Sequence, residues 1–109
     1  MLARKYRLPF KVRFKKVLFF SSHFFNARIR QNGLLHNRYA VLVSKKIDKR
    51  ATARNRIRRL IYAVLFEFLG KTKEGFDFLF TANKEAIGKT KKDFYLVIET
   101  MLKGESLLK

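Results

Sequence analysis

Apolar residues near the start of the chain recur at the spacing of one helical face. After Pro9, a residue type that suits the first turn of a helix, apolar side chains follow at positions i, i+4, i+7 and i+8. They are Phe10, Phe14, Val17 and Leu18. The pattern predicts a helix over residues 9–18, and the residues after it predict a short strand over residues 19–22.

The pattern then changes to the alternation that is typical of strands. Residues 24–30 predict a half-buried strand with one apolar face and one polar, basic face. The apolar set is Phe25, Ala27 and Ile29, and the opposite set is Phe24, Asn26, Arg28 and Arg30. Asn32-Gly33 is a strong turn signal. Residues 38–44 are apolar and β-branched, which predicts a central strand of the sheet.

The second half of the chain predicts two helices around one further strand. The first helix runs to about residue 69, with Thr52 as its N-cap and Gly70 just after its end. Its apolar stripe consists of Ile57, Leu60, Ile61, Val64, Leu65 and Phe68. Residues 76–81 alternate as a strand, and residues 91–103 repeat as a helix. The order α-β-(β)-β-α-β-α predicts an α+β fold, a two-layer sandwich of one sheet covered by helices, and we expect residues 1–109 to form a single domain.

Charge narrows the possible partners. The net charge is +18, and residues 1–62 hold 18 of the 26 Lys and Arg residues but only one acid, Asp48. Concentrating one sign causes self-repulsion, which a polyanionic partner such as nucleic acid offsets. A merely soluble basic surface is the plain alternative. Anionic lipid is another alternative, but lipid-binding basic helices usually have no fold of their own.

Other simple features bear on location and metal binding. No apolar run approaches the roughly 20 residues of a membrane span, and basic residues interrupt any signal-peptide core near the N-terminus. The absence of Cys excludes disulfides and thiolate metal sites. We therefore expect a cytoplasmic protein that is monomeric when free and that binds neither a membrane nor a small-molecule substrate.

The strongest local signal is a basic cluster at the start of the predicted second helix. Its members are Arg54, Asn55, Arg56, Arg58 and Arg59. Positive side chains in a first turn oppose the helix dipole, and violations of this kind usually occur at functional sites. Phosphate groups account for the cluster, because free N–H groups and guanidinium donors both bind them. Tyr62, on the same outward face, either stacks on a base or packs on the protein, and for Phe66 we favour packing.

A catalytic site in the protein is not expected. His23 and His36 are isolated, and Asp48 is the only acid in the basic half. No helical pair of His residues suggests a metal site. We therefore assign no catalytic residue and no metal ligand to the chain.

Two motifs together resemble the signature of the bacterial ribonuclease P protein family. They are Val43-Ser44-Lys45-Lys46 and Ala51-Thr52-Ala53-Arg54-Asn55-Arg56-Ile57-Arg58-Arg59-Leu60. The resemblance extends to Arg7-Leu8, Phe14 and Val17 on one side and to residues 77–82 on the other. Tyr62 and Asn83 depart from it, since each stands where the family often has a basic residue.

The resemblance implies a division of labour between RNA and protein. A catalytic RNA, with Mg²⁺, removes the 5′ leader of precursor tRNA, and the protein is an accessory subunit of this endonuclease. The residues implied to bind the catalytic RNA are Lys45, Lys46, Arg54, Asn55, Arg56, Arg58 and Arg59, and Tyr62 is a geometric candidate beside them. Phe14, Leu18 and Arg28 are implied to line a cleft for the leader, and the predicted strand face adds Phe24, Asn26 and Arg30. The family also implies a left-handed crossover through the second helix.

Two rival functions remain open from the sequence. A structural RNA-binding protein, such as a ribosomal component, would more often carry basic extensions free of core residues. A DNA-binding or membrane-active basic protein is the other class, although DNA readout usually uses a dimer and a recognition helix with varied side chains.

Overall fold

The computed structural model describes residues 6–8 and 17–109 of the chain. Within these described residues there are four strands: β1 (Leu18–Ser21), β2 (Phe25–Gln31), β3 (Arg38–Leu42) and β4 (Phe76–Ala82). The helices are α1 (Ala51–Phe68), the short 3₁₀ helix η2 (Lys84–Ala86) and α2 (Lys91–Gly104). Most of the predicted first helix, including Phe14, lies outside the described residues.

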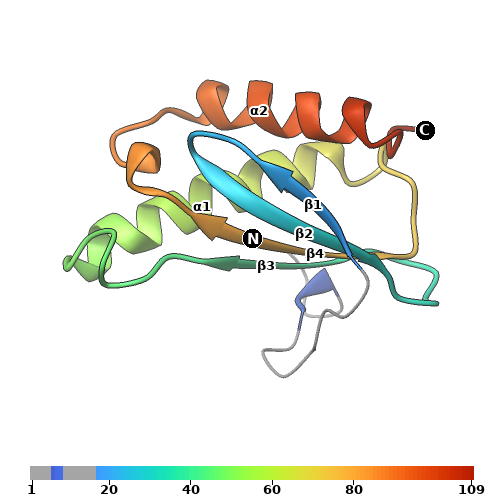
Figure 1. Cartoon of the computed structure of the whole chain (residues 1–109), viewed down its shortest axis with the longest axis horizontal. Helices are drawn as coiled ribbons and strands as arrows, with labels where there is room; N and C mark the ends of the chain where they lie inside the picture. The colour runs from blue at the N-terminus through green and yellow to red at the C-terminus, as the bar shows by residue number, and fades with distance from the viewer. Residues whose placement is uncertain (1–5, 9–16) are drawn as a thin grey trace.

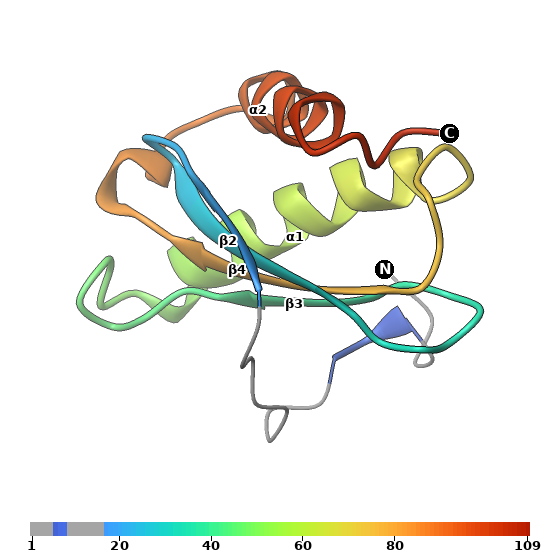
Figure 2. The same cartoon turned by 45° about the vertical axis from the view of Figure 1, so that its right-hand side comes forward.

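The strands form one sheet in the order β1-β2-β4-β3. The β1–β2 and β2–β4 pairs are antiparallel, and β3 and β4 are parallel. Both long helices lie on the same side of the sheet, as Figures 1 and 2 show. The predicted α+β sandwich of two layers is therefore confirmed.

The connection from β3 through α1 to β4 is left-handed. In Figure 1, β3 and β4 both run toward the left, β4 lies above β3, and α1 returns behind the sheet. This sense is the one that the family resemblance implies, and it opposes the general right-handed preference of parallel crossovers.

Aromatic rings fill the space between the sheet and the helices. Tyr39 stacks on Phe78 with 5.1 Å between ring centroids, and Phe25 meets Phe80 edge-on at 5.2 Å. The helices bury the stripes expected from their periodicity: Ile57, Ile61, Val64, Leu65 and Phe68 from α1, and Phe94, Ile98, Met101 and Leu102 from α2. The face of the sheet opposite the helices, here called the open face, carries the polar and basic residues of β2 together with a few apolar residues of the other strands.

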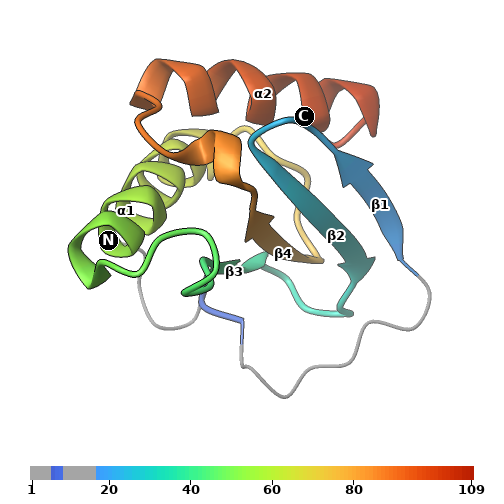
Figure 3. The same ribbon diagram turned by 60° about the vertical axis from the view of Figure 1, so that its left-hand side comes forward.

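The prediction that residues 38–44 form a central strand is wrong. β3 lies at one margin of the sheet and β1 at the other, as Figure 3 shows. β3 is nevertheless apolar because α1 covers it, and because Leu8 N–H donates to the Tyr39 carbonyl at 2.8 Å along its outer side. A strand that is buried by a helix and a short bridge therefore shows the same apolar sequence pattern as a strand that is buried between two others.

Leu18 lies in β1 and not in the predicted helix. It pairs with Ile29 across the β1–β2 ladder. The turn between these strands is held by Ser22, whose hydroxyl donates to the Phe25 carbonyl at 2.7 Å. Hairpin pairing therefore takes precedence over the helical spacing at residue 18. The predicted short strand over residues 19–22 is confirmed, one residue earlier than expected.

The boundaries of α1 also differ from the prediction. Arg50, not Thr52, is the N-cap, and it makes no side-chain cap. Asp48 accepts hydrogen bonds from the backbone N–H and the guanidinium of Arg50, so the chain turns into the helix two residues early. At the other end, the Thr72 hydroxyl donates to the Phe68 carbonyl at 2.8 Å. Gly70 does not adopt the left-handed conformation of a helix-ending glycine.

Candidate nucleic-acid interface

Arg54 forms hydrogen bonds with the loop that leads into α1. Its Nη1 atom donates to the carbonyl oxygens of Asp48, at 3.0 Å, and Lys49, at 2.8 Å. The Arg50 guanidinium holds the other side of Asp48, with Nη2 to Oδ2 at 2.9 Å. The hydrogen bonds from Arg50 lower the pKa of Asp48 to about 2, so the carboxylate stays ionised. The loop that carries Lys45 and Lys46, both exposed, is thereby tied to the helix.

The other basic residues of the cluster have different surroundings. Arg56 Nη1 donates to the Lys89 carbonyl at 3.2 Å, and Arg58 Nη2 donates to Asn55 Oδ1. Arg59 is exposed on the outward face, as its position in the helix predicts. Arg50, Arg56 and Arg59 line an open hollow between α1 and the η2–α2 connection. The first turns of α1 therefore present several cations around one concave surface.

The two rings further along α1 behave differently from each other. Tyr62 is half-buried and packs against the core. Burial raises its pKa, although hydrogen bonding with the Val41 backbone and the charges of Arg7 and Arg58 act in the opposite direction. Packing is thus its main role in the structure. Phe66 is 59% exposed, so the packing favoured for it is wrong.

The open face presents polar and basic residues in rows across the strands. Arg28 lies between Phe19 of β1 and Leu79 of β4. Asn26 lies in the next row, and its Oδ1 accepts a hydrogen bond from Ser21 Oγ at 3.0 Å. Directly paired strand residues share a face, so these side chains point away from the helices. The predicted grouping of Asn26, Arg28 and Arg30 on one strand face is confirmed.

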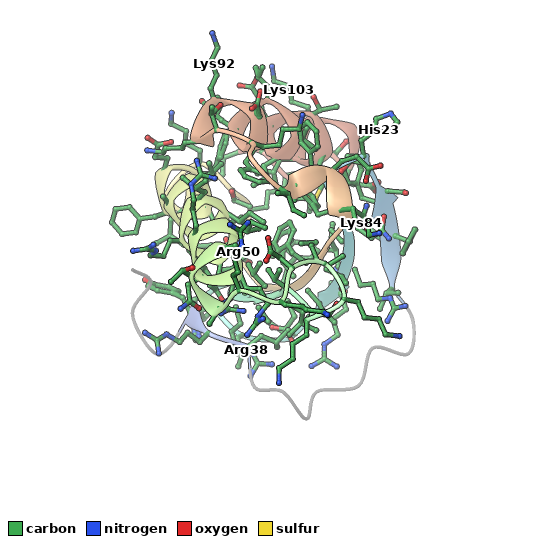
Figure 4. The ribbon with its side chains drawn as sticks, turned by 90° about the vertical axis from the view of Figure 1, so that its left-hand side faces the viewer. His23, Arg38, Arg50, Lys84, Lys92 and Lys103 are labelled. Carbon is green, nitrogen blue, oxygen red and sulfur yellow. The ribbon has the colours of Figure 1, made fainter. Side chains whose placement is uncertain are left out.

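A buried carboxylate organises the third row. Asp77 is 0% exposed and lies between Arg30 and Arg38 on the neighbouring strands. Arg30 Nε donates to Oδ2 at 2.9 Å, Arg38 donates to both oxygens at 2.8 Å, and Asn32 Nδ2 donates to Oδ1 at 2.9 Å. Burial alone would raise the pKa of Asp77, but these hydrogen bonds and the Arg38 charge bring it below its ordinary value. Figure 4 shows Arg38 on the side of the molecule opposite to Lys92 and Lys103 of α2.

Two residues assigned to the leader cleft lie elsewhere. Phe24 precedes β2 and meets Phe94 of α2 edge-on at 6.0 Å, so the prediction that it shares the face of Arg28 is wrong. The Ser22–Phe25 turn lies immediately before β2, so the alternation of the strand begins at residue 25 and does not include residue 24. Leu18 pairs with Ile29, so it shares the helix-side face of the sheet. Phe14 lies outside the described residues.

The sequence does not indicate the places of two residues on the open face. Phe19 belongs to a predicted strand that is too short for its two faces to be distinguished. Asp77 lies within the predicted strand over residues 76–81, and an acid inside an apolar strand of a basic chain is the signal that could have found it. Asn83, a departure from the family pattern, ties the β1–β2 turn to β4 by donating to the Ser22 carbonyl at 3.1 Å.

Within residues 6–8 and 17–109, no group of three His, Cys, Asp or Glu side chains is placed to hold a metal ion. His36 meets the ring of Tyr6 edge-on at 5.8 Å, and His23 lies exposed in the β1–β2 connection. No helix among the described elements has both the length and the apolar character needed to cross a membrane.

Comparisons with known proteins agree with this arrangement. The Ribonuclease P family model matches residues 2–104. The ribonuclease P protein component of Synechocystis sp. is 33% identical over 73 residues, which cover 67% of this chain and 59% of that relative's length. The corresponding protein of Synechococcus elongatus is 42% identical over 45 residues, covering 41% of this chain and 37% of the relative.

Solved structures share the fold. A Staphylococcus aureus RNase P protein mutant has a TM-score of 0.83 at 24% identity, with 95% of this chain and 91% of that chain covered. The RNase P protein from Thermotoga maritima has a TM-score of 0.64 at 22% identity, with 81% and 80% covered. Because the family model spans nearly the whole sequence, the chain belongs to the Ribonuclease P protein family.

Proposed function

We propose that this chain is the protein subunit of ribonuclease P, the ribonucleoprotein that removes the 5′ leader from precursor tRNA. The chain belongs to the family, and its charge favours a polyanionic partner. The catalytic RNA carries out the hydrolysis with Mg²⁺, and the protein contributes binding. In this proposal the protein is a cytoplasmic, single-domain chain that is monomeric before it meets the RNA.

The observation that carries the proposal is the cationic hollow at the start of α1. Arg50, Arg56 and Arg59 surround it. α1 has no acidic residue in its first turn and no side-chain cap. A helix start with these features gives up stability that an acid or a cap would supply. A phosphate backbone compensates, because it accepts hydrogen bonds from the free N–H groups and neutralises the guanidinium groups.

We assign the catalytic RNA to this end of α1 and to the preceding loop. Arg58, Arg59 and Asn55 lie on or beside the outward surface, and Lys45 and Lys46 are exposed in the loop. Arg54 and Arg56 already use guanidinium donors on backbone carbonyls. Their contribution is therefore partly to hold the surface in shape.

We assign the leader to the open face of the sheet. Asn26, Arg28 and Arg30 lie there, on the side opposite α1 and α2. An unpaired RNA strand suits such a face, because its phosphate backbone is accessible and can reach the exposed cations directly. The two RNA partners thus meet different layers of the sandwich.

Reconstituted cleavage tests the proposal. The protein is mixed with a cognate bacterial ribonuclease P RNA and precursor tRNA at a Mg²⁺ concentration too low for the RNA alone. We expect rapid removal of the leader only when the protein is present. A structural RNA-binding protein would bind RNA without this stimulation, and the absence of stimulation would refute the proposed function.

A further inference from the structure

Phe19 is a large aromatic residue of β1 whose ring lies in solvent. Its side chain is 56% exposed. Phe20, the next residue of β1, is partly buried against the core and lies 6.2 Å from the ring of Phe25. Alternation along the strand therefore sends one ring to the core and the other to the open face.

The register places this ring in a definite setting. Phe19 is directly opposite Arg28 in the β1–β2 ladder. Side chains paired in this way have Cβ atoms about 5 Å apart and point to the same face. Arg28 is itself exposed. Among the described strand residues, Phe19 is the only aromatic residue on the open face, since the other strand rings share faces with the core.

We infer that Phe19 stacks on an unpaired base while Arg28 binds an adjacent phosphate of the same strand. An exposed ring next to an exposed guanidinium matches the two parts of a single-stranded nucleotide, because every base has a face for stacking and every linkage has a charge. The inference rests on the proposed function, since the base belongs to the leader. It replaces Phe24, whose ring meets α2, with a ring that does lie on this face.

The neighbouring residues support a nucleic-acid strand over a protein or a lipid. The row beside Phe19 is polar: Ser21 donates to Asn26, and Thr81 lies across from Asn26 on β4. In the row of Phe19 itself, Arg28 separates the ring from Leu79 of β4. A ring that a cation separates from the next apolar side chain offers too little apolar area for a stable protein interface. It suffices for one base.

The test compares two exposed Phe residues in the reconstituted holoenzyme. Phe19→Leu removes the proposed stacking ring, and Phe66→Leu removes a ring of similar exposure on α1. Affinities are measured for precursor tRNA and for mature tRNA, which lacks the leader. We expect Phe19→Leu to weaken precursor binding about tenfold and to leave mature tRNA unchanged. Phe66→Leu should change neither affinity, and Phe19→Tyr should keep the parent values.

The salt dependence of precursor tRNA affinity distinguishes the contribution of the Phe19 ring from that of the Arg28 charge. Removing one phosphate contact lowers the slope of log affinity against log salt by about one. Arg28→Gln should therefore lower the slope for precursor tRNA, whereas Phe19→Leu should lower affinity equally at all salt concentrations. A Phe19→Leu holoenzyme that binds precursor tRNA as tightly as the parent would overturn the inference, and so would equal losses for both tRNAs. If the parent itself shows no preference for the leader, the leader-binding part of the proposed function fails instead.

Discussion

Arg54 and Arg59 lie five residues apart on α1 but have different surroundings. The Arg54 guanidinium donates to two carbonyls of the preceding loop, and Arg59 is exposed beside the hollow at the helix start. The same residue type can therefore shape a binding surface at one position and contact the ligand at the other. Sequence alone assigned both to the RNA, because a guanidinium suits either role.

Replacing each of these arginines with Gln should separate the two roles. Arg59→Gln removes a proposed phosphate contact, so the salt slope of affinity for the catalytic RNA should fall by about one. Arg54→Gln should lower affinity with a much smaller change in slope, because the Arg54 guanidinium donates to carbonyls of the preceding loop. Filter binding over a range of salt concentrations measures both. Equal changes in slope would show that Arg54 is a direct phosphate ligand.

Asp77 is the residue on which the open face most depends for its shape. It is buried between Arg30 and Arg38, and removing one partner of such a group leaves charges uncompensated. We expect Asp77→Asn to lower the free energy of unfolding by about 3 kcal/mol. Urea denaturation measures the change, and Glu74→Gln, which breaks an exposed pair with Lys109, is the matched control with an expected change below about 1 kcal/mol.

The same carboxylate predicts a dependence of stability on pH. The pKa of Asp77 is lowered in the folded protein, so its contribution is complete above the ordinary aspartate pKa of about 3.9 and is lost as pH falls through the lower folded value. The parent should therefore lose more stability than Asp77→Asn as the pH falls below about 4. Parallel curves for the two proteins would contradict this assignment.

At the scale of the elements, the two long helices begin in opposite ways. α2 starts with a complete capping box, in which the Thr90 hydroxyl accepts from Asp93 N–H and Asp93 accepts from Thr90 N–H. α1 starts with Arg50 and no side-chain cap. The contrast fits the proposed use of the start of α1 for RNA binding, whereas the cap of α2 contributes stability.

Arg50→Ser at the start of α1 should raise the stability of the protein and weaken its binding to RNA. Serine in the extended conformation of residue 50 can cap the helix, and the exposed pair with Asp48 that it removes contributes little. We expect thermal or urea unfolding to show a gain of about 0.5–1 kcal/mol. Affinity for the catalytic RNA should fall. A more stable protein that binds the RNA as well as the parent would show that Arg50 has no part in binding.

Thr90→Ala is the complementary change at α2. It removes one half of the capping box, so the free energy of unfolding should fall by about 1 kcal/mol. Thr90 follows the η2–α2 connection, which borders the hollow at the start of α1, but its side chain does not line that hollow. Affinity for the catalytic RNA and for precursor tRNA should therefore remain at the parent values. A loss of RNA affinity in the folded variant would place an RNA contact near this helix.

At the scale of the whole molecule, periodicity predicted the layers well. The apolar stripes of α1 and α2 and the two faces of β2 are where the spacing placed them, because burial against one layer imposes a 3.6- or 2-residue repeat. The strand order was less predictable. A helix and the Leu8 bridge bury β3 at the margin of the sheet, and no local pattern distinguishes this from a central strand.

The candidate site was predicted in part. The basic cluster on α1 is visible as charge against the helix dipole. The β1–β2 turn sets the direction of Phe24, and the loop carbonyls set that of Arg54. The exposure of Phe66 depends on the space beside α1. All three are tertiary features that a local pattern does not show. The crossover sense agreed with the family resemblance, not with the general chirality rule.

The most direct test of the whole account maps which RNA lies near which layer. The chain has no Cys, so a single introduced Cys can carry an iron chelate that cleaves nearby RNA. Thr52→Cys at the start of α1, Ser21→Cys on the open face and Thr100→Cys in the second half of α2 are three exposed positions. In the reconstituted holoenzyme with precursor tRNA, residue 52 should direct cleavage of the catalytic RNA, residue 21 should direct cleavage of the leader, and residue 100 should direct neither. Leader cleavage from residue 100 but not from residue 21 would contradict the account.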